Sequence, residues 1–273
     1  MERGDLIQSL LRSRSIPQRK LDAPQWQVRY GLTLAEYQVT FKELVSQGYR
    51  LKCVSGYFSG QRYAVLWAKE TGPEWQALYD LSSSEYQRTF DDLARQGYRL
   101  TWVNGYESSG IEKFASIWEK RPGPPWVARR ELTGDELQLL QTTLQQQGYR
   151  MNRISGYESG GIVKYATIWE KRPGPAWTAR WGLDRSQYSQ TFETLRQQGY
   201  RPIDISGYLA AGSAHYAAIF QEWSGAHWSA WSMLTAPTLQ SKLDDLGRQG
   251  YHPTELGGYN IGDDDFYEVV WEQ

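Results

Sequence analysis

One tryptophan recurs along this chain at an almost constant interval. Successive copies are 49, 51, 51 and 51 residues apart, and each is followed 22 residues later by a Gly-Tyr pair and then by a second Gly-Tyr pair. The tryptophans are Trp26, Trp75, Trp126, Trp177 and Trp228. Five copies at one period predict a repeat architecture, in which each copy helps to cover the apolar surface of its neighbour.

The third copy shows the elements that one repeat is expected to form. Residues 126–132 alternate large and polar side chains, as a half-buried strand does. Thr133 with Glu136 has the spacing of a capping box, so a helix is predicted to begin there. Gly148 is expected to end this helix, because glycine enters the left-handed conformation without a Cβ clash.

Two further strands are expected after that glycine. Residues 151–157 and 165–169 are rich in large apolar side chains, and the Gly/Ser-rich turn between them is typical of a hairpin. The unit is therefore strand, helix, strand, strand. The fifth copy departs from the capping box, since Thr235 and Thr238 stand around Pro237, and a weaker helix start is expected there.

The predicted fold class is α+β, with five tandem strand-helix-strand-strand repeats closed into a propeller-like ring with pseudo-symmetry. We expect the strand Trp26–Leu32 to close the ring by joining the sheet of the last copy, because closure removes exposed strand edges. The predicted boundaries are 1–25 for an N-terminal extension and 26–74, 75–125, 126–176, 177–227 and 228–273 for the repeats of one domain.

Composition excludes several classes of function. The 30 Lys and Arg are balanced by 31 Asp and Glu, without the basic excess of a nucleic-acid-binding protein. No run approaches the roughly 20 apolar residues of a membrane span. The first 25 residues hold no signal-peptide core, so the chain as given is expected to be soluble and cytoplasmic, or secreted if a leader has been removed.

Three motifs in the repeats resemble a known family. They are Ile154-Ser155-Gly156-Tyr157, Tyr165-Ala166-Thr167-Ile168-Trp169-Glu170 and Ala176-Trp177-Thr178-Ala179-Arg180. At a period near 50, they resemble the bacterial tandem repeat domain that is also the N-terminal domain of fungal polyglycine hydrolases. The resemblance spans residues 26 to 273 and implies an accessory module, because in those proteins the repeats precede a β-lactamase-like serine protease domain.

The catalytic half of such a hydrolase is missing from this sequence. A β-lactamase-like site needs Ser-x-x-Lys, and no serine here is followed three residues later by lysine. We therefore predict a non-enzymatic binding or interaction module, without cofactor or metal. Its expected ligand is an unidentified protein or carbohydrate polymer, and neither nucleic acid nor a membrane is expected as a partner.

A pentein-like enzyme that modifies guanidines is the alternative from another class. Such chemistry needs a nucleophilic cysteine with a histidine, and closure of a ring would bring distant copies together. Cys53 is the single cysteine, and the histidines are His215, His227 and His252. Against this alternative, Cys53 stands at an ordinary strand position, where a small buried hydrophobic side chain is expected.

Two other polar patterns have structural explanations. Asp263, Asp264 and Asp265 lie in a predicted hairpin turn without the spacing of a calcium loop, so a solvated turn is expected. Arginines follow the first Gly-Tyr in four copies and are expected to bind carbonyl groups at the helix ends. These arginines are Arg50, Arg99, Arg150 and Arg201, and Glu119, Glu170 and Glu222 are candidates to pair with arginines of the next copy.

Four tryptophans stand outside the five-fold pattern and are the best candidates for exposed binding residues. They are Trp102, Trp181, Trp223 and Trp231. Exposed aromatic rings bind sugars and peptides well. We predict a ligand site across the fourth and fifth copies, formed by Trp181, Trp223 and Trp231 with polar contacts from Arg180 and Glu222.

Overall fold

The computed structural model describes residues 25–57 and 61–273. The predicted N-terminal extension therefore lies outside the described residues, except for Gln25. Within the described ranges, every repeat contains the predicted strand, helix, strand and strand.

The elements of the five repeats follow one another in the same order. The first repeat contains β1 (Trp26–Leu32), α1 (Leu34–Ser46), β2 (Arg50–Tyr57) and β3 (Arg62–Ala68). The second contains β4 (Trp75–Ser82), α2 (Ser83–Arg95), β5 (Tyr98–Ser108) and β6 (Ile111–Lys120). The third contains β7 (Trp126–Leu132), α3 (Gly134–Gln146), β8 (Tyr149–Ser159) and β9 (Ile162–Lys171). The fourth contains β10 (Trp177–Asp184), α4 (Arg185–Gln197), β11 (Tyr200–Ala210) and β12 (Ser213–Glu222). The fifth contains β13 (Trp228–Leu234), α5 (Ala236–Arg248), β14 (His252–Ile261) and β15 (Asp264–Glu272).

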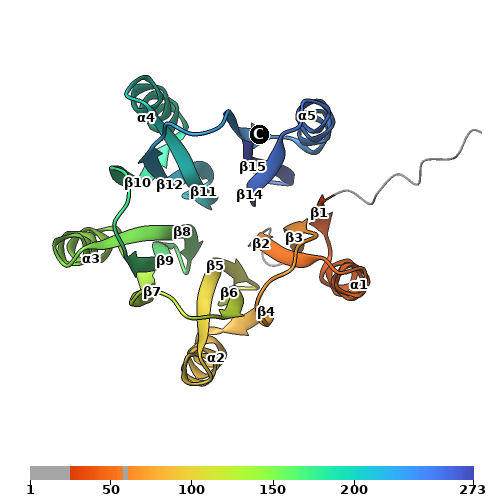
Figure 1. Ribbon diagram of the computed structural model, residues 1–273, viewed down its shortest axis with the longest axis horizontal. Helices are drawn as coiled ribbons and strands as arrows, with labels where there is room; N and C mark the ends of the chain where they lie inside the picture. Colours follow the sequence, from red (N-terminus) through yellow and green to blue (C-terminus); the bar gives the residue numbers. More distant parts are fainter. Residues whose placement is uncertain (1–24, 58–60) are drawn as a thin grey trace, which may run out of the picture.

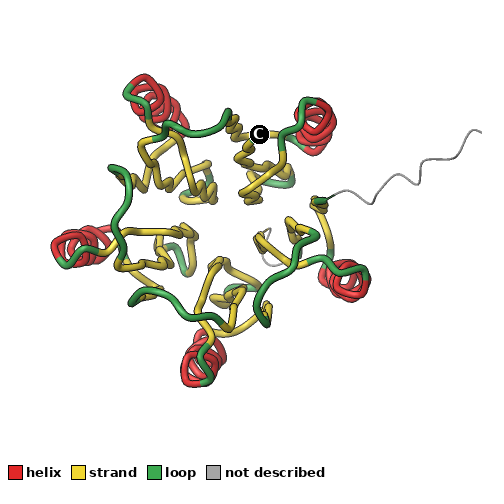
Figure 2. Tube along the Cα trace, in the orientation of Figure 1, coloured by secondary structure: helices red, strands yellow, loops and turns green. Residues whose placement is uncertain are grey.

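Each repeat folds its three strands into a separate antiparallel sheet. The last strand lies in the middle, as in the order β1-β3-β2. Figure 1 shows the five units around a common centre, with β2, β5, β8, β11 and β14 facing inward and the five helices on the periphery. Figure 2 shows the same arrangement, with the helix of every unit on the outside and its strands toward the centre. The inner strand β14 of the fifth unit also contacts β2 of the first.

The helix ends confirm the local predictions. Thr33, Ser82, Thr133 and Asp184 each form a complete capping box with the residue three positions on, whereas Thr235 makes no side-chain cap. The weaker start of the fifth helix is therefore confirmed. All five helices are followed by a glycine at a φ between 82° and 85°, a conformation that strains a residue with a Cβ.

The prediction for the first strand is wrong. β1 pairs with β3 of its own repeat, with Trp26 opposite Ala68, and the sheet of the last repeat consists of β13, β15 and β14 alone. Each sheet is completed within its repeat, because the Trp-initiated strand pairs with the last strand of the same unit. Among residues 25–57 and 61–273, no strand is left to be exchanged between the first and last repeats.

The Trp26 side chain nevertheless contacts the last repeat. The ring of Trp75 shows the usual arrangement, since it lies 6.4 Å from the ring of Trp67 in the preceding repeat. Trp26 packs against a core cluster that contains residues of the first repeat and, from the last repeat, residues such as Leu239, Leu243 and Trp271. It also lies against Gly247 of α5, where an added Cβ would be 3.4 Å from the indole. The repeats therefore contact one another through side chains rather than through shared sheets.

The second Gly-Tyr pair of each repeat contacts both of its neighbours. The tyrosine of one repeat lies on the glycine of the preceding repeat, so closely that a Cβ on Gly56 would be 2.7 Å from Tyr106. The same packing places Tyr57 of the first repeat on Gly258 of the fifth, at 2.8 Å. Only glycine leaves room for the ring, which explains why the pair recurs in every copy.

The core lies between the sheets and the helices. Among its largest fully buried side chains are those of the middle strands, Trp67, Trp118, Trp169, Phe220 and Trp271. No helix in residues 25–57 and 61–273 combines the length and the apolar character needed to cross a membrane.

Candidate functional site

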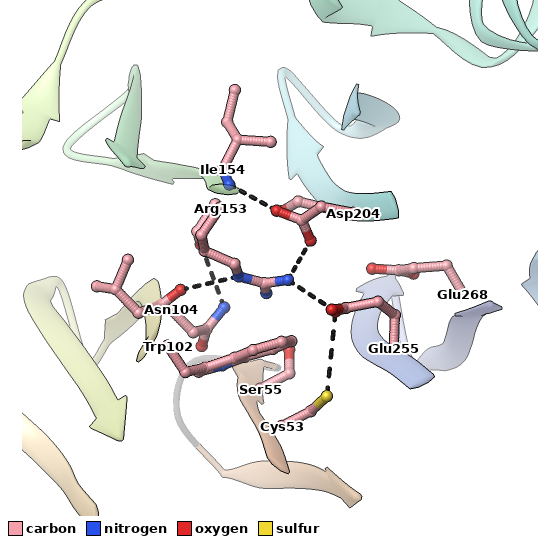
Figure 3. Close-up of polar contacts among 12 residues, drawn as sticks. Cys53, Ser55, Trp102, Asn104, Arg153, Ile154, Asp204, Glu255 and Glu268 are labelled. Atoms are coloured by element: carbon pink, nitrogen blue, oxygen red, sulfur yellow. Dashed lines mark hydrogen bonds and ion pairs between the residues drawn. The ribbon is translucent and has the colours of Figure 1, made fainter. Parts of the chain in front are cut away.

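One position on the inner strands carries a different side chain in every repeat. It lies three residues before the glycine of the second Gly-Tyr pair and is occupied by Cys53, Trp102, Arg153, Asp204 and Glu255. Because the inner strands face the centre, these five side chains meet there in one layer, which we call the axial layer (Figure 3). Five chemically different side chains of a repetitive chain are thus gathered in one place.

The axial layer satisfies backbone groups that the sheets leave unpaired. An inner strand has a neighbour on one side only, so its other edge presents free N–H and C=O groups. The indole Nε1 of Trp102 donates to the carbonyl of Val54 in the preceding repeat at 2.7 Å. Asp204 likewise accepts a hydrogen bond from the N–H of Ile154 at 2.6 Å.

A second layer of side chains, two residues further along each inner strand, also satisfies unpaired backbone groups. The N–H of each Gly-Tyr glycine donates to a polar side chain of the following repeat. The pairs are Gly56 to Asn104, Gly105 to Ser155, Gly156 to Ser206, Gly207 to Glu268 and Gly258 to Ser55, at 2.8, 3.1, 3.0, 2.8 and 3.2 Å. The last of these bonds joins the fifth repeat to the first, so the same contact occurs at every junction between neighbours.

The fifth repeat provides its second-layer acceptor from a different strand. Gly257 stands where the other repeats have Ser or Asn, and the carboxyl group of Glu268 in β15 fills the space that its side chain would occupy. The other repeats have alanine at the position of Glu268, namely Ala64, Ala115, Ala166 and Ala217. The two substitutions therefore compensate each other sterically.

Arg153 occupies the middle of the axial layer. Its guanidinium carbon lies 3.2 Å from the ring centroid of Trp102, and Nε donates to the carbonyl of Val103 at 3.3 Å. Nη1 pairs with Asp204 and, at 3.1 Å, with Glu255. The buried guanidinium thus has ionic partners from the fourth and fifth repeats, and Figure 3 shows it between them and the indole.

Desolvation dominates the ionisation of this region. Burial raises the pKa of Asp204 to about 6 despite its contact with Arg153, and raises that of Glu268 to about 8. Burial and the nearby Asp204 also raise the pKa of Glu255. At neutral pH we therefore expect Asp204 to carry the charge that balances Arg153 and Glu268 to hold a proton.

The repeat motifs agree with a family described as polyglycine hydrolase-like, structural repeat. The family model matches residues 23–70, 72–121, 123–172, 174–223 and 225–273, one match for each repeat. The chain belongs to this family. The matches include every Gly-Tyr pair, so the junction contacts in this polyglycine hydrolase-like repeat protein are formed by residues within the matched segments.

A cavity of about 160 Å³ lies on the axis beside the second layer. It is lined by residues of all five repeats, chiefly the Gly-Tyr pairs, and by Asn104. The residues that follow the tyrosines, among them Glu107, Glu158, Leu209 and Asn260, are half-buried where the cavity opens at the end that carries the hairpin turns. All five polyglycine hydrolase-like repeats thus contribute residues to one cavity.

Free strand edges face this cavity. Gly105 directs its N–H to Ser155 and therefore away from its partner strand β6. N–H and C=O directions alternate along an antiparallel strand, so Glu107 two residues later also turns these groups away from β6. The same reasoning applies to Glu158 and Leu209. Among the described residues that line the cavity, these three are therefore expected to turn their main-chain N–H and C=O groups away from their own sheets.

The arginine prediction is corrected by the structure. Arg50 does not bind carbonyl groups of its helix end; it donates to the carbonyl of Pro73 at 2.6 Å and pairs with Glu119 of the following repeat at 3.1 Å. The expected direction of pairing is also wrong, since Glu119 and Glu170 meet arginines of the preceding repeat. In the fourth repeat Gln221, not the predicted Glu222, makes the equivalent contact. The equivalent contacts are Arg99 with Glu170, Arg150 with Gln221, and Arg201 with Glu272, at 3.1, 3.1 and 2.6 Å.

The tryptophans outside the repeat pattern lie in four different environments. Trp102 is buried in the axial layer, so its prediction as an exposed residue is wrong. Trp181 is half-buried, 6.4 Å from the ring of Tyr165 in the preceding repeat. Trp223 is half-buried beneath the guanidinium of Arg201, 3.4 Å from its ring centroid. Trp231 is 42% exposed and carries the ammonium group of Lys242 on its ring at 3.6 Å.

The remaining predicted site residues are at the surface. Arg180 is exposed and donates to the carbonyl of Ala179. Glu222, the last residue of β12, is also exposed. The contacts of the three predicted tryptophans join them to separate neighbours rather than to one another. Trp181 also occupies the position of Tyr30 and Tyr79, so it belongs to an aromatic position of the repeat after all.

The nucleophile of the enzyme alternative lies in the axial layer. Cys53 is buried, its Sγ is 4.0 Å from Glu255, and burial raises the pKa of the thiol. The histidines lie elsewhere: His215 beside Tyr208, and His227 and His252 exposed. In residues 25–57 and 61–273, no three His, Cys, Asp or Glu side chains gather to hold a metal ion.

Sequence reasoning did not find the axial layer or the cavity. Aligning the five copies would have shown that this column holds five chemically different residues beside columns of Val/Ile/Leu, of mostly Ser, and of Gly-Tyr. That variation marks a position where five-fold repetition ends. The contacts themselves join residues about 50 positions apart, which no local pattern reveals.

Proposed function

We propose that this chain is a non-enzymatic binding module, closed into a propeller-like ring, whose axial cavity holds part of an extended polymer or of a protein surface. The observation that carries the proposal is the cavity with its free strand edges at Glu107, Glu158 and Leu209. Main-chain groups in a concave site bind extended chains by adding hydrogen bonds to an open strand edge.

The contacts between the last repeat and the first support closure of the ring. Gly258 and Ser55 form the same hydrogen bond as the glycines and polar side chains at the other junctions. The hydroxyl groups of Tyr57 and Tyr267 are 3.0 Å apart, as those of Tyr165 and Tyr208 are at 2.9 Å. A closed ring also explains why five repeats share one cavity.

The chemistry of the axial layer supports binding rather than catalysis. Its ionisable groups are engaged with one another: Arg153 is paired with Asp204 and Glu255, and Cys53 is buried with a raised pKa. A catalytic thiol needs a lowered pKa and access to substrate. The open space instead lies beside main-chain groups and glycines, which suit recognition.

The family description suggests the first ligand to try. The family is named after polyglycine hydrolases, so polyglycine is the natural peptide probe for this module. A cavity of about 160 Å³ also favours a slender chain, since a cavity of roughly 150 Å³ in a protein interior holds a molecule as small as benzene.

The tryptophan surface predicted from the sequence is a second location for the same function. Trp231 is its best-exposed member, and exposed aromatic side chains dominate the energy of many binding sites. If the site lies there, Trp231→Ala should weaken binding by about 1–2 kcal/mol without unfolding the protein.

A glycan and peptide array that includes polyglycine tests the proposal. Captured ligands should then be measured by calorimetry with the wild type, with Leu209→Trp, which fills the mouth of the cavity, and with Trp231→Ala. Loss of binding in Leu209→Trp alone supports the axial site, and loss in Trp231→Ala alone moves the site to the tryptophan surface. Failure of the array to show any ligand, or chemical conversion of a captured ligand seen by mass spectrometry, contradicts the proposal.

A further inference from the structure

We infer that the axial cavity recognises a primary ammonium group at the end of a slender chain. The inference rests on the proposed binding function and names the chemical group that the cavity takes. Three features carry it: the cavity is blind, the charged residues among its described lining are acidic, and strand segments at Glu107, Glu158 and Leu209 turn main-chain groups away from their own sheets beside it.

The cavity is blind because the axial layer blocks the axis below it. Asn104 and Ser155 of the second layer are joined by a hydrogen bond of 3.3 Å. Beneath them, the stacked pair of Arg153 and Trp102 occupies the centre, and both residues are 4% exposed (Figure 3). A polymer therefore cannot pass through the ring. It can only present a chain end or a side-chain tip from the hairpin side.

The charge around the cavity is negative. Glu107 and Glu158 are the charged residues among the described residues that line it. Each carboxylate accepts one backbone N–H from the turn of the following repeat. Glu107 accepts that of Gly160 at 2.9 Å, and Glu158 accepts that of Ala211 at 2.8 Å. These bonds hold the two carboxylates beside the mouth and leave lone pairs for a cation. The positive charge of Arg153 below is balanced by Asp204.

An ammonium group matches this lining. It brings three hydrogen-bond donors and one positive charge. Two carboxylates line the cavity, and strand alternation predicts outward-turned main-chain carbonyl groups at Glu107, Glu158 and Leu209. A carboxylate chain end would instead meet Glu107 and Glu158 as like charges. The ammonium can come from the N-terminus of a peptide or from a lysine side chain, which present the same group on a narrow stem.

Calorimetry with three small probes tests this inference on the wild-type protein. The probes are hexaglycine, N-acetyl-hexaglycine and N-acetyl-lysine amide. Hexaglycine should bind at least about tenfold more tightly than its acetylated form, because acetylation removes a charge-assisted contact. Its affinity should also fall above about pH 8, where an α-amino group loses its proton. Binding of the lysine probe shows whether a side chain serves equally well.

Variants locate the ammonium contact. Glu107→Gln with Glu158→Gln keeps an acceptor for each turn N–H but removes the charge, and should abolish the preference for free hexaglycine over the acetylated form. Glu193→Gln is the control, because Glu193 is exposed on α4 and pairs with Arg196 there. Thermal unfolding checks that all variants remain folded.

The outcomes separate this inference from the proposed function. Equal affinity for hexaglycine and N-acetyl-hexaglycine in the wild type contradicts ammonium recognition and leaves a binding module intact. Ammonium recognition is also contradicted, and the binding module again stands, if an array ligand without an ammonium group binds the cavity. Loss of that ligand's binding in Leu209→Trp would show that it binds there. If no probe and no array ligand binds, both proposals are wrong.

Discussion

The carboxyl group of Glu268 occupies the space where a side chain of residue 257 would stand. Gly257 has no Cβ, and the Glu268 Oε1 accepts the N–H of Gly207 at 2.8 Å, as Ser206 accepts that of Gly156 at 3.0 Å. One repeat thus reaches the same backbone group from a neighbouring strand. The axial contacts depend on where an acceptor atom lies, and two different residue pairs can provide it.

This exchange predicts a double-mutant cycle. Gly257→Ser should destabilise the protein because its side chain overlaps Glu268, and Glu268→Ala should do so because the N–H of Gly207 loses its acceptor. Each change should cost about 1–3 kcal/mol. The double variant recreates the Ser and Ala pair of the fourth repeat and should recover most of the loss. Additive single effects in denaturant unfolding would contradict this compensation.

The raised carboxyl pKa values predict that the protein is less stable at high pH. The folded-state pKa of Glu268, about 8, and of Asp204, about 6, lie above the ordinary values near 4. The folded state therefore binds more protons than the unfolded state at intermediate pH, and the free energy of unfolding falls as pH rises. For Glu268 the fall extends from about pH 5 to about pH 8.

Glu268→Gln should remove that part of the pH dependence, because glutamine resembles the protonated carboxyl and keeps an acceptor for Gly207. The measurement is the denaturation midpoint of both proteins from pH 5 to pH 9. Parallel curves would show that Glu268 does not hold its proton in the folded state. Glu193→Gln, which changes an exposed carboxylate, is the control.

The junction between the fifth and first repeats should open first. At the other four junctions an arginine pairs with an acidic or amide side chain, but here the two positions hold His252 and Ala68. This junction also lacks the short linker that joins consecutive repeats. We expect the amide of Gly258 to exchange with solvent faster than that of Gly156, although both are hydrogen-bonded to serine.

Building the missing ion pair tests the cause. The double variant His252→Arg/Ala68→Glu should slow exchange at Gly258, by up to about fivefold for a contact worth roughly 1 kcal/mol. Exchange at Gly156 should not change. Slower exchange at both glycines, or at neither, would show that the absent pair does not set the local opening.

Two kinds of glycine should respond differently to substitution. Gly199 has a φ of 84°, and no atom lies within 4 Å of an added Cβ. Gly199→Ala should therefore cost only the strain of the left-handed backbone, about 1 kcal/mol, and Gly199→Asn should cost less because asparagine tolerates this conformation. Gly148→Val, with a branched side chain at a φ of 82°, should lose about 1–3 kcal/mol.

Gly156 makes the contrast, because its neighbour is the Tyr208 ring rather than open space. Gly156→Ala should be more destabilising than Gly199→Ala. Gly156→Asn should be more destabilising still, whereas Gly199→Asn should be less destabilising than Gly199→Ala. Thermal unfolding of the four variants distinguishes the mechanisms. Rescue of both glycines by asparagine would mean that backbone conformation, not the tyrosine contact, limits Gly156.

The sequence by itself determined the content of each repeat. The Thr133 and Glu136 capping box, the glycine after each helix and the hairpin turn act between residues a few positions apart, so their spacing is sufficient to specify them. The fifth helix supports this conclusion, because its sequence lacks the capping box and Thr235 makes no side-chain hydrogen bond to the start of the helix. The five-fold period then fixed the number of units.

Only the tertiary structure decided how the units meet. Trp26–Leu32 had two possible partners, β3 and β15, which carry nearly the same apolar pattern, and the chain path within one repeat selected β3. Trp102, Arg153 and Asp204 acquire their roles only because three inner strands face one axis. These contacts join residues about 50 positions apart, where the physical determinant is the geometry of neighbouring repeats and not the local sequence.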